Sequence, residues 1–132
     1  AYVNTRRLRV SSRTRMADSI FATGIPFMGK KDHGRFLKEL ERFMEVSAGV
    51  RRYGAASLDL CYVAAARYDG FWERDLQEWD IAAGIIIARE AGALVSQIDG
   101  GEKMLEKGDI LASNPGVNSA MMEIFRELRL GR

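Results

Sequence analysis

Apolar residues recur at helical spacing in four segments of the chain. The first segment begins near Asp32 and predicts a helix that ends at Gly49. Its apolar positions are Phe36, Leu40, Phe43 and Met44, and its polar positions include Lys38, Glu39, Glu41 and Arg42. The second segment, "LDLCYVAAARY", predicts a helix whose apolar face is Leu58, Cys61, Tyr62 and Ala65. The last two predicted helices cover residues 80–91, before Gly92, and 117–128, after an Asn-Pro-Gly break.

Short apolar runs between these helices predict strands. The runs are residues 19–23, "GFWERDL" from Gly70, "LVSQI" from Leu94 and "DILAS" from Asp109. Residues 2–10 predict a hairpin that turns at Asn4-Thr5. Strands and helices alternate along much of the chain. This favours an α/β fold, a mixed β-sheet with helices on both faces, as a single domain over residues 1–132.

Composition limits the classes of protein that fit this fold. The chain has 132 residues and 47% hydrophobic residues, enough for one buried core. Its net charge of +2 is too mild to argue for nucleic acid by itself. No apolar run reaches membrane-spanning length, and no signal peptide is visible. A single cysteine excludes an internal disulfide and fits the cytoplasm. The chain begins at Ala1 without methionine, so we expect its natural N-terminus upstream.

Asp80 comes first among the residues that could carry chemistry. It stands at the start of an apolar helix, where its carboxylate could accept hydrogen bonds from free backbone N–H groups. Alternatively it could bind magnesium, which prefers hard oxygen ligands. The small residues 82–84 would leave room for a ligand. A lone carboxylate makes no catalytic site, so other acids have to join it.

Three further features could join Asp80, and each also has a structural interpretation. Glu73 could project toward the same end of the sheet and accept hydrogen bonds from a polyol, or be an exposed strand acid. The small "GAAS" segment, 54–57, could bring a ligand close to backbone N–H groups, or be capped by Ser57. Arg51 and Arg52 could reach a phosphate or lie on the surface.

The other candidate residues have a structural role as their simplest interpretation. We expect His33 on the surface, Cys61 in the core, and Trp72 and Trp79 in the core or under the site. The basic N-terminal cluster is expected to be solvated, with nucleic-acid contact as an alternative; it comprises Arg6, Arg7, Arg9, Arg13 and Arg15.

The segment "EWDIAAGIIIAREAGA", 78–93, resembles a signature of the inositol monophosphatase family. In order along the chain, "VNTRRLRVS" resembles the family's mid-chain hairpin and "ATGIPF", 22–27, the strand that follows it. "RRYGAASLDLCYVAAARYDGFWE" resembles the family's Arg-x-x-Gly-[Ser/Thr]-Ala-Ala segment, and "DILASNPGV" its last strand. The resemblance covers essentially all 132 residues, and it corresponds to the C-terminal half of a typical member.

The resemblance also implies what this half lacks. In the family, an upstream glutamate and an Asp-Pro-Ile/Leu-Asp-Gly-Thr segment supply most magnesium ligands and the threonine that positions the water. Neither occurs in this sequence. The resemblance therefore implies the C-terminal domain of the sugar-phosphatase fold, without the N-terminal metal-binding half and with no catalytic residue beyond the metal ligand.

Roles carry over to individual residues as implications of the resemblance. Asp80 corresponds to a magnesium ligand near the substrate hydroxyls, and Glu73 to the glutamate that binds the inositol ring. The substrate-contacting backbone segment corresponds to Gly54, Ala55 and Ala56, where Ala55 replaces the usual hydroxyl residue. Arg51 is a weaker candidate for substrate binding.

Together these expectations describe part of a Mg²⁺-dependent phosphatase, inactive alone, that acts on inositol phosphate or a related sugar phosphate. Its expected partners are the missing N-terminal half and, in the complete enzyme, a second copy in a homodimer. A fructose-1,6-bisphosphatase or an adenosine bisphosphate phosphatase of the same family is an alternative. A non-catalytic module for dimerisation or nucleic-acid binding is another. An exposed apolar face is expected where the other half is missing.

Overall fold

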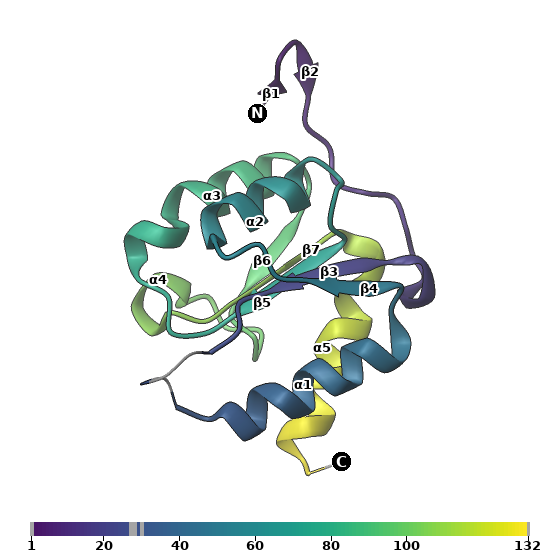
Figure 1. The fold of residues 1–132 in the computed structure, drawn as a ribbon. Coiled ribbons are helices and arrows are strands. Elements are labelled where there is room, and N and C mark those ends of the chain that lie inside the picture. Colours follow the sequence, from purple (N-terminus) through teal and green to yellow (C-terminus); the bar gives the residue numbers. More distant parts are fainter. Residues whose placement is uncertain (1, 27–28, 30, 132) are drawn as a thin grey trace.

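A computed structural model of the chain contains a five-stranded mixed sheet with two layers of helices (Figure 1). It describes residues 2–26, 29 and 31–131, so Ala1 and Phe27, both named above, lie outside the described residues. The sheet strands are β3 (Ile20–Thr23), β4 (Gly49–Arg51), β5 (Gly70–Glu73), β6 (Leu94–Ser96) and β7 (Ile110–Ser113). Their order in the sheet is β4-β3-β5-β7-β6. β3 pairs in parallel with β4 and β5, whereas β7 is antiparallel to β5 and β6.

Helices cover both faces of this sheet, which confirms the predicted fold class. They are α1 (His33–Val46), α2 (Ala56–Ala64), α3 (Glu78–Glu90), α4 (Met104–Lys107) and α5 (Pro115–Arg129). In Figure 1, α2 and α3 lie above the sheet and α1 and α5 below it. The hairpin of β1 (Tyr2–Val3) and β2 (Arg6–Arg7) projects away from the upper side. A single turn of 3₁₀ helix (Met16–Asp18) precedes β3.

Two aromatic and aliphatic cores fill the space between the layers. Below the sheet, Phe43 stacks on Trp72 with ring centroids 4.3 Å apart, and Phe125 and Phe21 pack around them. The upper core lies between the sheet and α2 and α3. There Gly84 lets α3 approach α2, since a Cβ on Gly84 would lie 2.6 Å from Leu60 Cδ1. Trp72, expected in the core or under the site, is 1% exposed and confirms that expectation.

Several predicted element boundaries are wrong. The first helix ends at Val46, and Gly49 instead begins the missed edge strand β4. The strand "GFWERDL" ends at Glu73, because Asp75 takes a left-handed φ of +59°. α2 already begins at Ala56, so Ser57 lies inside it and is not its cap. The hairpin strands contain two residues each and exclude Leu8 and Val10.

Periodicity also assigned some residues to the wrong side of a helix. In α1, Met44 is 65% exposed, whereas Glu39, predicted among the polar positions, is buried. In α2 the buried positions are Ala56, Asp59, Leu60, Val63 and Ala64. The face that was predicted to be buried, formed by Leu58, Cys61, Tyr62 and Ala65, therefore points outward, and Leu58 is 40% exposed. The prediction was wrong because α2 is apolar on both sides, so its sequence pattern does not indicate which side is buried.

Candidate active site

The sheet brings three loops together at one edge. Because β3, β4 and β5 are parallel, their carboxyl ends lie on the same side of the sheet, toward the left of Figure 1. The loop after β3 leads down to α1, while the loop after the adjacent β5 leads up to α3. Neighbouring strands whose connections leave to opposite faces open a crevice, where α/β sheets commonly bind ligands.

A cavity of about 210 Å³ occupies this point. It lies between the end of β3, the end of β5 and the first turns of α1 and α3. Its lining comprises Thr23, Gly24, Ile25, Pro26, Lys31, Asp32, Arg35, Phe36, Trp72, Glu73, Arg74, Asp75, Leu76 and Asp80. Glu73 and Asp80, seven residues apart in sequence, therefore line the same cavity, as their predicted roles require.

Glu73 is positioned by the close approach of two strand ends. The Thr23 hydroxyl donates to the Trp72 carbonyl at 2.8 Å, which ties β3 to β5 in the interior. The Glu73 carboxyl then lies against the backbone of Gly24: a Cβ there would be 2.2 Å from Glu73 Cδ. A larger residue would require the Glu73 carboxyl to move from this position, so Gly24 is part of the site although the sequence analysis gave it no role.

Asp80 occupies the first turn of α3 and caps it. Its Oδ2 accepts a hydrogen bond from the backbone N–H of Gln77 at 2.9 Å, half of a capping box. The structural interpretation of Asp80 is thus confirmed. It does not exclude metal binding, because a carboxylate oxygen has more than one lone pair and Asp80 also lines the cavity.

The other predicted residues lie at the same edge but outside this cavity. Arg51 ends β4 and folds back along it, with its Nη1 3.4 Å from the Val50 carbonyl. The turn at Gly54 (φ +96°) and Ala55, the N-cap of α2, follow from the same strand. Among the described residues none of Arg51, Gly54, Ala55 and Ala56 lines the cavity.

Cavity residues that the sequence analysis did not single out supply much of its charge. Asp32 and Asp75 both take left-handed φ values, and Arg74 follows Glu73 directly. The described lining holds four carboxylates and three cations, and one of those cations, Arg35, pairs with Asp32 at 3.3 Å. Asp75 could have been found from its place between a strand and a helix, where Asp tolerates the left-handed turn.

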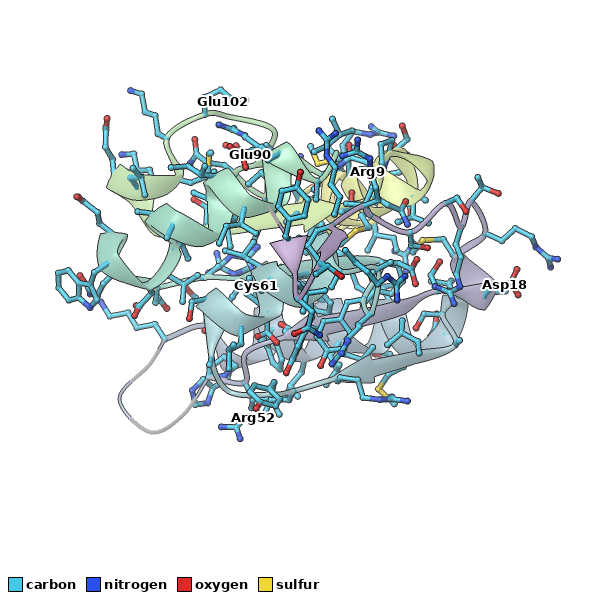
Figure 2. All side chains as sticks on the ribbon, turned by 90° about the horizontal axis from the view of Figure 1, so that it is seen from above. Arg9, Asp18, Arg52, Cys61, Glu90 and Glu102 are labelled. Carbon is cyan, nitrogen blue, oxygen red and sulfur yellow. The ribbon has the colours of Figure 1, made fainter. Side chains whose placement is uncertain are left out.

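The remaining candidates lie away from this edge. His33 begins α1 and is exposed, as expected. Trp79 is 78% exposed on the outer side of α3, so its predicted packing in the core or under the site is wrong. Cys61 is half-buried, not in the core, and burial raises the pKa of its thiol. Figure 2 looks onto α2 and α3 and labels Cys61 there, with Arg52 at the end of β4.

The matching family model is that of the inositol monophosphatase family, and it covers residues 1–129. The chain belongs to the inositol monophosphatase family. An inositol-1-monophosphatase of Rhizobium meliloti is 48% identical over 126 residues, which are 96% of this chain and 47% of that protein. A protein of Pseudomonas aeruginosa named Nus factor SuhB is 46% identical over 124 residues, 92% of this chain and 46% of that protein.

Solved structures of the family share the fold. The extragenic suppressor protein suhB of Bartonella henselae matches with a TM-score of 0.89 and 45% identity, over 94% of this chain and 48% of that one. The inositol monophosphatase of Anabaena matches with a TM-score of 0.82 and 32% identity, over 94% and 51% of the two chains. The chain thus spans about half the length of these relatives.

The carboxylates that line the cavity could supply only part of a magnesium site. Carboxylate oxygens are the ligands that Mg²⁺ prefers, and Mg²⁺ often takes one or two of them with waters and substrate phosphate. Within residues 2–26, 29 and 31–131, however, no three His, Cys, Asp or Glu side chains converge as a metal-binding group. The residues present would fill one or two positions of a magnesium shell and would need further ligands to complete it.

Proposed function

We propose that this chain is the substrate- and metal-binding half of a Mg²⁺-dependent phosphatase that hydrolyses inositol phosphate or a related sugar phosphate in the cytoplasm. The observation that carries the proposal is the cavity between β3 and β5, lined by Glu73 and Asp80. Family membership over residues 1–129 gives this cavity its chemical context. As a separate finding, none of the described helices is long and apolar enough to cross a membrane.

In this proposal each acid has a distinct role. Glu73, whose carboxyl lies against Gly24, accepts hydrogen bonds from ring hydroxyls and orients the sugar. Asp80 holds one Mg²⁺, and its bond to the Gln77 N–H fixes the carboxylate in position. Bound Mg²⁺ supplies an activated water and stabilises the charge of the phosphoryl group in transfer. The residues of this half bind and orient, so the chain alone is inactive.

The outer side of α2 and α3 is the proposed docking surface for the other half. Both helices are apolar on their outward side as well, which is typical of helices covered on two faces. Leu58, Trp79 and Ile86 are 40%, 78% and 61% exposed there. A cavity of about 630 Å³ extends between this surface and the hairpin. A segment of about this chain's own length, as the relatives possess, would cover it.

The test is magnesium-dependent phosphate release from inositol 1-phosphate. We expect none from the chain alone, and activity when it is combined with the N-terminal half of the Rhizobium meliloti relative. Asp80→Asn should then lower the affinity for Mg²⁺ by tenfold or more, while the folded α3 is kept because the amide oxygen can still accept the Gln77 N–H. Wild-type turnover and Mg²⁺ affinity in that variant would refute the role of Asp80.

The same reconstituted enzyme can be used to test which substrate of the family it prefers. We propose inositol phosphate ahead of fructose 1,6-bisphosphate and an adenosine bisphosphate, because two relatives at 48% and 47% identity are named inositol-1-monophosphatase. The measurement is kcat/KM across the three substrates. A tenfold preference for either bisphosphate would replace the proposed substrate. Sedimentation of the complete enzyme tests the homodimer proposed for it.

The hairpin supports a second candidate, a module that binds nucleic acid. Arg6 and Arg7 are exposed on a hairpin that projects from the body, and relatives of similar identity carry the name Nus factor. If this candidate holds, nucleic-acid affinity should fall steeply with salt and drop at least tenfold when Arg6, Arg7 and Arg9 are replaced by Gln. The matched control replaces Arg126 and Arg129 on α5. Equal losses in the two variants would contradict a site on the hairpin.

A further inference from the structure

A buried acid interrupts the apolar side of α1. Glu39 is 2% exposed and lies between Phe36 and Phe43, which fill the lower core. Its Oε1 accepts a hydrogen bond from Arg74 Nη1 at 2.6 Å. A carboxylate at such a position costs free energy even when it is paired, and an apolar residue would pack there at least as well. The Glu39–Arg74 pair therefore calls for an explanation beyond packing.

Arg74 connects this pair to the candidate active site. It follows Glu73 at the end of β5, and its side chain is 23% exposed. It lines the cavity that holds Asp80 and also a second cavity of about 380 Å³ against α5. Arg74 therefore lines both cavities, and its guanidinium is bound to Glu39, which lines only the second one.

We propose that Glu39 is a positioning residue that keeps the Arg74 guanidinium away from Asp80, so that Asp80 can bind a cation. An arginine on a flexible side chain pairs readily with a carboxylate, often through two hydrogen bonds. Such a pair would neutralise the charge that attracts Mg²⁺ and occupy the oxygens that ligate it. Holding Arg74 at Glu39 prevents the competition. The inference rests on the proposed magnesium role of Asp80.

The experiment is a double-mutant cycle read by Mg²⁺ affinity, measured by calorimetry on the chain and on its complex with the N-terminal half of a relative. Glu39→Gln keeps the size of the side chain and removes its charge, and it should weaken Mg²⁺ binding at least fivefold. Arg74→Gln should leave the affinity equal or raise it. In the double variant the affinity should return to within twofold of Arg74→Gln. A double variant as weak as Glu39→Gln would overturn the proposal, since a packing role predicts that result.

A crystal structure of the Glu39→Gln variant gives a readout independent of metal. Arg74 hydrogen-bonded to Asp80 supports the proposal, whereas Arg74 still bound to residue 39 overturns it.

Should Glu39→Gln not fold, Glu39→Met fills the apolar site and releases Arg74 equally. If the wild-type protein does not bind Mg²⁺ at all, the proposed function fails, while the position of Arg74 in these variants still decides whether Glu39 restrains it.

Discussion

At the scale of single residues, two buried aspartates, Asp69 before β5 and Asp59 in α2, differ in how their carboxylates are hydrogen-bonded. Asp69 is fully buried and accepts hydrogen bonds from the Ile20 N–H at 2.9 Å and from Asn114 Nδ2 at 3.0 Å. Asp59 in α2 is 1% exposed, and neither of its oxygens has a hydrogen-bond partner among the described residues. Burial accordingly raises the pKa of Asp59 to about 6.

This pKa predicts that Asp59→Asn stabilises the protein above neutral pH. In the folded protein the pKa of Asp59 lies above its ordinary value of 3.8, because ionisation of the buried carboxyl is unfavourable. The free energy of unfolding is therefore highest below about pH 4 and falls as the pH rises through about 6. Replacement should raise the free energy of unfolding by about 1–2 kcal/mol at pH 7.5 and change it little at pH 4. Urea denaturation at both pH values measures this.

The control for this prediction is Glu45→Gln, which removes an exposed carboxylate from α1. Its effect should be small and similar at the two pH values. A destabilised Asp59→Asn at pH 7.5 would mean that the carboxylate has an interaction which the amide cannot replace.

At the scale of elements, the contact of α2 with α3 depends on the missing side chain at Gly84. We predict that Gly84→Ala destabilises the fold by about 1–3 kcal/mol, although alanine favours helices, because its Cβ would meet the side chain of Leu60. Gly34→Ala in α1 is the matched control, since its Cβ meets open space, and it should be neutral or slightly stabilising. Thermal unfolding compares them. A Gly84→Ala variant as stable as Gly34→Ala would show that α2 can shift freely.

At the scale of the whole molecule, the helices of the two layers differ in what they leave uncovered. α1 and α5 are amphipathic, although α1 also leaves Leu37, Met44 and Val46 exposed, whereas α2 and α3 are apolar on their buried and their outer sides alike. Exposed apolar patches commonly mark interaction sites. The docking proposed for the other half and the self-association expected of this chain alone therefore use the same surface.

Ile86→Lys tests this surface. The isolated chain should self-associate at micromolar concentration, and the variant should shift it toward monomer, since a charged side chain would have to be buried in the contact. Met44→Lys on α1, where Met44 is 65% exposed, is the control and should change nothing. Sedimentation velocity measures both. Equal behaviour of the two variants would place the contact elsewhere.

The sequence by itself determined the class of the fold, most helices and strands, and two of the four acids in the described lining of the cavity. These follow from local spacing, from glycine and proline punctuation, and from the resemblance of segments such as 78–93 to a family. The end of β5 at Glu73 was missed because a single left-handed residue, Asp75, decides it, and the end of α1 at Val46 was missed because Gly49 belongs to the next strand.

Only the tertiary structure decided which side of an apolar helix is buried, because α2 offers the same apolar surface in two directions. It also decided the contacts between residues distant in sequence. Glu39 and Arg74, 35 residues apart, meet only when α1 packs beneath β5. Gly24 gains its role only when β5 lies beside β3, so that the Glu73 carboxyl needs the space. Sequence patterns record local geometry, whereas such pairs depend on how the layers come together.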